Sequence, residues 1–172
     1  TWTHSSIQPS QGEEAFDSTY KPGGTLTAVM DNWTSRVEEK GVDPYGLGRW
    51  SYIALRGSRN TKVYIVTAYR VCDNKDSGPM TAYRQQFRKL SKEFIKQRYR
   101  KRRDLHKQCI LDLQAWLEMV VKQGHQIILS LDSNEDISDT PLSFIPLTYR
   151  EHQHATHPTH NGSLATLMTT CG

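Results

Sequence analysis

The sequence lacks long apolar runs, has little cysteine and shows no acidic excess. No apolar run approaches the ~20 residues that a membrane-spanning helix needs, and no signal-peptide pattern opens the chain. The three cysteines, Cys72, Cys109 and Cys171, are odd in number and widely spaced. This argues against a disulfide framework and favours a reducing compartment. We therefore expect an intracellular protein, either nuclear or cytoplasmic.

Apolar residues are also sparse, because they make up 36% of the chain, against about 45–50% in ordinary globular domains. A length of 172 residues still fits one domain with a core of normal size. The sequence begins with Thr1 rather than Met and ends in Thr-Thr-Cys-Gly without a closing element. We expect one truncated domain over residues 1–172.

Positive charge is concentrated in one stretch, which we call the basic segment (residues 84–107). It holds 11 of the 22 Lys and Arg residues, opposed only by Glu93 and Asp104. Its densest part is Arg98-Tyr99-Arg100-Lys101-Arg102-Arg103. Such a block favours contact with a polyanion, since each neutralised phosphate releases counterions. A solvated, disordered insertion is the alternative, and the two interpretations are compatible.

Apolar and β-branched patterns predict four strands. These lie at Thr25–Met30, Trp50–Leu55, Lys62–Tyr69 and Gln126–Leu131. Gly57-Ser58-Arg59-Asn60 is typical of a hairpin connection between the second and third. We expect the first three strands to form an antiparallel meander and all four to share a sheet. Residues before Lys21 and after Asp136 are expected to be loops, with Ser163–Thr170 a candidate start of a last helix.

Two helices are predicted between the third and fourth strands. Met80–Lys96 is helical in propensity but only weakly amphipathic, whereas Asp104–Gln123 has one clear apolar face. That face comprises Leu105, Cys109, Leu113, Trp116, Leu117, Val120 and Val121. Asp104 suits the N-cap, and Gly124 suits the left-handed residue after the helix. We expect this face, Trp116 included, to pack on the sheet.

The fourth strand leads into a polar cluster, Asp132-Ser133-Asn134-Glu135-Asp136. Ligands of open α/β sheets bind just beyond the carboxyl ends of strands, so this is a candidate active-site edge. The alternative is a polar loop in which Asp and Asn cap a turn or a helix. Taken by itself, the stretch leaves both interpretations open.

Four short motifs come in a characteristic order. They are Gly23-Gly24-Thr25 before a strand, Gly48-Arg49-Trp50 opening the next, Thr67-Ala68-Tyr69-Arg70 ending the third, and Leu131-Asp132-Ser133-Asn134-Glu135 ending the fourth. In this order they resemble the endonuclease/exonuclease/phosphatase superfamily, most of all the endonuclease domains of retrotransposons and reverse-transcriptase polyproteins. The resemblance covers residues 21–136. It implies a partial four-layer α/β sandwich, with a mixed sheet and flanking helices, that hydrolyses phosphate esters with Mg²⁺ or Mn²⁺.

The resemblance also implies catalytic roles for Asp132, Asn134 and Tyr69. Asp132 would orient or deprotonate the attacking water, Asn134 would contact the scissile phosphate, and Tyr69 would lie near the same phosphate. These residue types suit the reaction, since water needs a nearby base and phosphate oxygens need donors. The alternative for Tyr69 is a core tyrosine, and Arg70 is either a phosphate clamp or a surface charge.

Two parts of the family pattern are missing. No strand is expected before Lys21 to carry the family's early acidic metal ligand, so the main ligand is expected upstream of Thr1, and Asp132 is a weak metal candidate. No Asp-His pair follows Asp136 to close the site. A histidine run, His152, His154, His157 and His160, suggests either a zinc site or, as we expect, a surface loop.

Two functions therefore remain open. The first is Mg²⁺-dependent phosphodiester hydrolysis of nucleic acid by a fragment of a larger mobile-element polyprotein. The second is a non-catalytic, nucleic-acid-binding remnant of the same fold. The basic segment favours nucleic acid over a small phosphate ester. We expect DNA rather than RNA as the partner, and no membrane. We expect the isolated chain to cleave poorly, because part of the site is missing.

Overall fold

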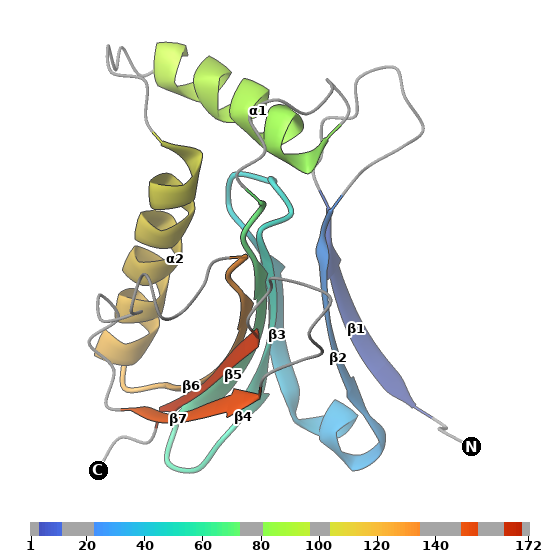
Figure 1. The fold of residues 1–172 in the computed structure, drawn as a ribbon. Helices are drawn as coiled ribbons and strands as arrows, with labels where there is room; N and C mark the ends of the chain where they lie inside the picture. The colour runs from blue at the N-terminus through green and yellow to red at the C-terminus, as the bar shows by residue number, and fades with distance from the viewer. Residues whose placement is uncertain are drawn as a thin grey trace.

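The computed structural model describes residues 4–11, 23–72, 81–96, 104–134, 149–154 and 164–169, which form a mixed α/β fold (Figure 1). The elements are β1 (Ser5–Ser10), β2 (Thr25–Met30), the 3-10 helix η1 (Asp31–Arg36), β3 (Val37–Val42), β4 (Trp50–Arg56), β5 (Lys62–Tyr69), α1 (Ala82–Lys96), α2 (Leu105–Lys122), β6 (Gln126–Asp132), β7 (Tyr149–His154) and β8 (Leu164–Thr169).

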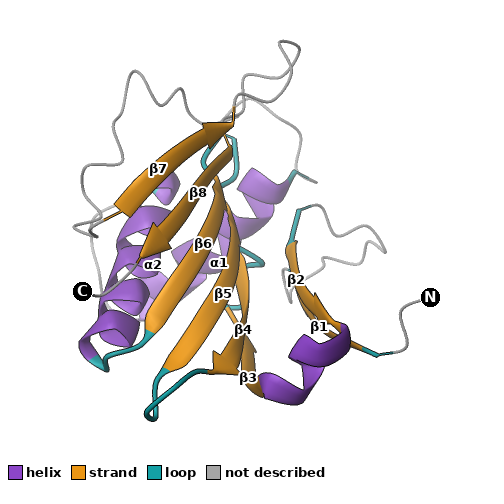
Figure 2. Ribbon diagram, turned by 90° about the horizontal axis from the view of Figure 1, so that it is seen from below, coloured by secondary structure: helices purple, strands orange, loops and turns teal. Residues whose placement is uncertain are grey.

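A six-stranded sheet in the order β3-β4-β5-β6-β8-β7 forms the centre of the fold (Figure 2). Only β5 and β6 pair in parallel, and the other neighbours are antiparallel. Helix α2 covers one face, and a separate antiparallel pair, β1 and β2, packs on the other (Figure 1). The described residues thus show three layers with a mixed sheet, while the four-layer sandwich stays a prediction.

The four predicted strands are present, but β2 does not share the sheet with the other three. It pairs with β1, so the expected meander is limited to the β4–β5 hairpin. The buried side chains of β2 are Thr27 and Val29, and the Thr27 hydroxyl donates to the Ser51 carbonyl at 3.0 Å. These side chains lie against β4 and β5 face to face, which is packing between sheets rather than pairing within one.

Two strands that the sequence did not predict lie in the first part of the chain. Residues before Lys21 were expected to be loop, yet Ser5–Ser10 form β1, a polar strand with Pro9. Strand β3 is charged, as is common at sheet edges. The packing of β3 requires glycine at position 41, because a Cβ there would lie 2.5 Å from the Tyr52 ring.

The segment after Asp136 also differs from the prediction. Tyr149–His154 and Leu164–Thr169 are the strands β7 and β8, so neither an all-loop tail nor a last helix is correct. Strand β8 lies between β6 and β7, with backbone ladders on both sides. Pairing partners distant in sequence decide such a segment, and local propensity does not reveal them.

Both predicted helices are confirmed as α1 and α2. The Asp104 side chain accepts a hydrogen bond from the His106 N–H at 2.9 Å, and Gly124 has φ +80°, as its place after the helix requires. The main core combines Leu113, Leu117 and Val120 of α2 with Trp50, Ala54, Tyr64, Val66, Ala68, Ile127, Leu129 and Leu131. Trp116 is partly buried and packs against this core, as expected.

A buried ion cluster of Asp43, Arg49 and Asp112 connects the loop before β4 to helix α2. Arg49 donates from Nε and Nη2 to the Asp43 carboxylate at 2.6 and 2.8 Å, and from Nη1 to Asp112 at 2.7 Å. The Arg49 side chain is fully buried. Burial alone lowers the pKa of Arg49, but the hydrogen bonds and charge of Asp43 outweigh it and keep this pKa above its ordinary value.

Breaking this cluster should cost much of the stability. Asp43→Ala leaves the Arg49 guanidinium buried without its bidentate partner, and we expect a loss of about 3–5 kcal/mol in the free energy of unfolding. Urea denaturation followed by circular dichroism measures it. The matched control is Glu38→Ala, which removes an exposed pair with Arg56 at 3.9 Å and should cost at most about 1 kcal/mol. Equal losses in the two variants would contradict the expectation.

Candidate functional site

The carboxyl ends of β5 and β6 meet at one edge of the sheet, and this brings the predicted site residues together. In the parallel register, Tyr69 is the Cα partner of Asp132, and the Arg70 N–H donates to the Asp132 carbonyl at 2.9 Å. Asn134 follows two residues after Asp132. The expectation that Tyr69, Asp132 and Asn134 converge is therefore met, whereas their chemical roles stay predictions.

Asn134 bridges the two strand ends with its side-chain amide. Its Nδ2 donates to the Arg70 carbonyl at 2.5 Å, and its Oδ1 accepts from the Cys72 thiol at 3.1 Å. Its backbone has φ +48°, in the left-handed region that asparagine tolerates. The amide is therefore held in one orientation, with one of its two N–H groups engaged by the Arg70 carbonyl.

Asp132 also has a local structural role. Its Oδ1 accepts from the Asn134 backbone N–H at 3.3 Å, which closes an Asx-type turn. The alternative in which Asp132 caps a turn is therefore correct for its Oδ1 atom. It does not exclude a chemical role, because a carboxylate has a second oxygen and further lone pairs.

Tyr69 is not a purely core tyrosine, because its side chain is only half-buried. Burial raises the pKa of its phenol, and electrostatic interaction with Cys72 and Asp132 raises it further. A hydrogen bond with the Asn134 side chain acts in the opposite direction. At neutral pH the phenol is protonated, so it is available as a hydrogen-bond donor.

Two residues near this edge were not predicted as members of the site. Cys72 is exposed and contacts Asn134, although the cysteine spacing had indicated only that a disulfide framework is absent. Gly23, with φ +79°, lies so close that a Cβ would be 3.2 Å from the Ala82 Cβ and 3.6 Å from the Tyr69 ring. Cys72 follows Tyr69 by three residues, just beyond the end of β5. This position in the sequence is the signal that could have identified Cys72 as a neighbour of the site.

The remaining predicted nucleic-acid contacts have mixed outcomes. Arg70 is 5% exposed, so the surface-charge alternative is wrong, and little of its guanidinium is available to a phosphate. Arg98, Arg100, Lys101, Arg102 and Arg103 lie outside the described residues. Nucleic-acid contact by the central part of the basic segment therefore stays a prediction.

Within the predicted site, Asp132 supplies the carboxylate that would bind a metal ion. Among residues 4–11, 23–72, 81–96 and 104–134, and in the two late strands, no group of three His, Cys, Asp or Glu side chains is arranged to hold a metal. His152 and His154 belong to β7 rather than to the expected surface loop, while His157 and His160 lie outside the described residues. The described residues therefore do not form a complete metal site.

Comparisons with known proteins give one weak likeness. No protein-family model matches the sequence, and no curated protein matches it. A solved structure, D. rerio TDP2 complexed with a single-strand DNA product, aligns over 95% of this chain with 12% identity and a TM-score of 0.39. This chain spans 62% of the length of that TDP2 chain. A likeness of this size identifies neither the family nor the activity.

The half-buried phenol gives a direct test of the site geometry. Asp132→Asn removes a negative charge beside Tyr69 and should lower the pKa of the Tyr69 phenol. Asn134→Ala removes a hydrogen bond that stabilises the ionised phenol and should raise the same pKa. Titration of ¹³C-labelled tyrosine by NMR measures both shifts. Tyr64 is the internal control, because burial and Glu39 raise its pKa at the other end of β5. A Tyr69 pKa that neither variant moves would show that the three groups are not in contact.

Proposed function

We propose that the edge formed by Tyr69, Asp132 and Asn134 hydrolyses phosphodiester bonds of nucleic acid. The observation that carries this proposal is the parallel pairing of β5 with β6, which aligns Tyr69 with Asp132 and lets Asn134 bridge the two ends. A base, a neutral donor and a hydroxyl thus occupy one strand-end edge, where ligands of α/β sheets bind.

Each group has a role that its contacts support. A water attacks the phosphorus in line, and its proton passes to the Asp132 oxygen that is not engaged in the turn, while the bond to the leaving oxygen breaks. The Tyr69 hydroxyl donates to a phosphate oxygen, where negative charge develops, and the Asn134 amide positions the phenol through their hydrogen bond. The fixed orientation of the Asn134 amide means that little reorganisation is needed during the reaction.

Dependence on Mg²⁺ or Mn²⁺ rests on the family resemblance. Mg²⁺ is usually held by one or two carboxylates together with substrate phosphates and waters. Asp132 offers one carboxylate, and the described residues supply no complete set. A bound cation would stabilise the charge that develops on the phosphate, and Asp132 is the residue of this site that would help to hold it.

Nucleic acid is the proposed partner, and DNA is favoured over RNA. The basic segment supports a nucleic-acid partner, because its 11 positive residues are opposed by only two negative ones in sequence. An origin in a retrotransposon-type polyprotein and a nuclear or cytoplasmic location belong to the same proposal. A non-catalytic, nucleic-acid-binding remnant is the second candidate, favoured by the incomplete metal ligand set among the described residues.

A cleavage assay distinguishes the two candidates. The purified chain is incubated with a labelled oligonucleotide duplex, with Mg²⁺ or with a chelator. With Mg²⁺ present, we expect slow cleavage by the parent chain. Asp132→Asn should reduce its rate at least about 100-fold, since a general base contributes about 10²–10⁴ in rate. This substitution keeps an acceptor for the Asn134 N–H, so a loss of rate reflects the base rather than the turn.

The matched control is Glu38→Gln, which neutralises an exposed carboxylate on β3 away from the site. It should leave the rate unchanged. Equal rates in the parent and Asp132→Asn would point to a contaminating nuclease and contradict the proposal. Tight, salt-dependent binding without any cleavage would favour the non-catalytic candidate.

The basic segment makes a separate prediction about binding. We expect weak, sequence-independent binding whose log affinity falls linearly with log salt, because phosphate contacts release counterions. Changing Arg98, Arg100, Lys101, Arg102 and Arg103 together to Gln should flatten that slope by about 0.9 for each phosphate that is no longer neutralised. Fluorescence anisotropy at several salt concentrations measures the slope. An affinity that stays flat as salt rises would contradict phosphate contact.

A further inference from the structure

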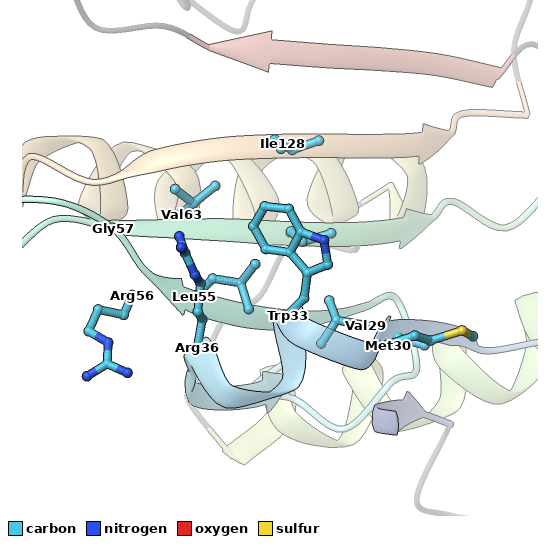
Figure 3. A pocket seen from close by; sticks show the side chains of 11 residues that line it. Val29, Met30, Trp33, Arg36, Leu55, Arg56, Gly57, Val63 and Ile128 are labelled. Atoms are coloured by element: carbon cyan, nitrogen blue, oxygen red, sulfur yellow. The ribbon is translucent and has the colours of Figure 1, made fainter. Parts of the chain in front are cut away.

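A concave surface lies on the sheet face opposite α2, between that face, β2 and η1. It is a pocket of about 500 Å³, within the ~300–1,000 Å³ of small-molecule sites (Figure 3). Its aliphatic wall consists of Val29, Leu55, Val63, Ile65 and Ile128. Apart from Val29 of β2, these residues lie toward the amino ends of β5 and β6 and at the end of β4, so the pocket is at the opposite end of the sheet from Tyr69 and Asp132.

The rim of the pocket is formed by η1 and combines an indole with a guanidinium. Trp33 is 55% exposed and extends over the sheet, while Arg36 is directed toward Val63 (Figure 3). The Arg36 Cζ atom lies 5.5 Å from the centre of the Trp33 ring. The indole thus orients the guanidinium beside the aliphatic wall.

The charge of Arg36 is not neutralised by the part of the chain that the structure describes. No described carboxylate lies within ion-pair distance of it, whereas the neighbouring Arg56 pairs with Glu38 at 3.9 Å and points away from the pocket (Figure 3). Besides these two arginines, the lining side chains are apolar, apart from the indole N–H of Trp33. A ligand rich in polar groups would leave them unpaired against this wall, which is unfavourable.

We propose that this pocket binds a free alkyl carboxylate, a straight hydrocarbon chain with one anionic end. The chain lies along the aliphatic wall of Val63, Ile65 and Ile128 and removes that wall from water. The carboxylate pairs with the planar guanidinium of Arg36, whose donors match its two oxygens. Charge complementarity at the rim therefore selects an anionic amphiphile over a neutral or cationic one.

Calorimetry with decanoate, below its micelle concentration, tests the proposal on the full chain. We expect saturable one-to-one binding, and no binding of decyltrimethylammonium, which has the same chain with the opposite charge. Arg36→Gln should weaken decanoate binding about tenfold, as expected for losing a charge-assisted hydrogen bond. Arg59→Gln, in the exposed turn between β4 and β5, is the matched control and should leave the affinity unchanged.

Tryptophan fluorescence assigns the binding to this pocket. Decanoate should shift the emission of the parent chain and of Trp116→Phe, which changes a tryptophan on the α2 face, but not that of Trp33→Phe. Circular dichroism checks that each variant folds. If a variant does not fold, the comparison of decanoate with decyltrimethylammonium on the parent chain still tests the proposal.

Three results would overturn the proposal. They are the absence of saturable decanoate binding, equal affinity for the cationic amphiphile, and an emission shift that survives in Trp33→Phe. A second copy of the chain is the alternative occupant of this apolar surface. Concentration-dependent dimerisation that Trp33→Asp abolishes, together with no decanoate binding, would assign the pocket to self-association instead.

Discussion

The parallel pairing of β5 with β6 is the constraint on which the candidate site depends. A parallel pair cannot be closed by a tight turn, so the chain crosses over through α1 and α2 before it returns as β6. The register then places Tyr69 beside Asp132. A slip of one residue would turn each β6 side chain to the other face, out of the core or into it. Burial of Leu129 and Leu131 against α2 therefore fixes the site as well as the sheet.

The buried ion cluster supports the same edge from the other side. Asp43 holds Arg49 with two hydrogen bonds and accepts a further one from the Leu47 N–H at 3.3 Å, so one carboxylate shapes the whole loop before β4. The Arg49 carbonyl then accepts from the Tyr69 N–H at 2.7 Å. Removing such charges from water is expensive, so a cluster of this kind is better understood as a device for specific geometry than as a source of net stability.

The two faces of the large sheet are built differently, and each end of the sheet offers different chemistry. The α2 face is a continuous apolar and aromatic core. On the other face, the contact with β2 combines the hydroxyls of Thr27, Ser51 and Thr67 with a small apolar cluster around Ile53. Polar donors and a carboxylate gather where β5 and β6 end, and an apolar pocket lies where they begin. Phosphate chemistry and hydrocarbon binding would therefore not compete for one surface.

The sequence by itself determined the elements whose own pattern records their burial. Strand β4, whose Trp50 faces one core and whose Ile53 faces the other, lies where the sequence predicted a strand, and helix α2 and its Asp104 cap are likewise present. The turn at Asp132 and Asn134 is likewise local, because its hydrogen bond spans only two residues. Such features depend on neighbours along the chain, and neighbours along the chain are what a sequence shows.

Tertiary structure decided which partner each element takes. Strands β1 and β3 carry too many polar residues to be recognised, and they exist because backbone ladders with β2 and β4 stabilise them. The burial of Arg70 and the contact of Cys72 with Asn134 arise from pairing across a sequence separation that no local pattern encodes. A periodic pattern records that a face is buried but not what buries it, since the hydrophobic effect is non-directional.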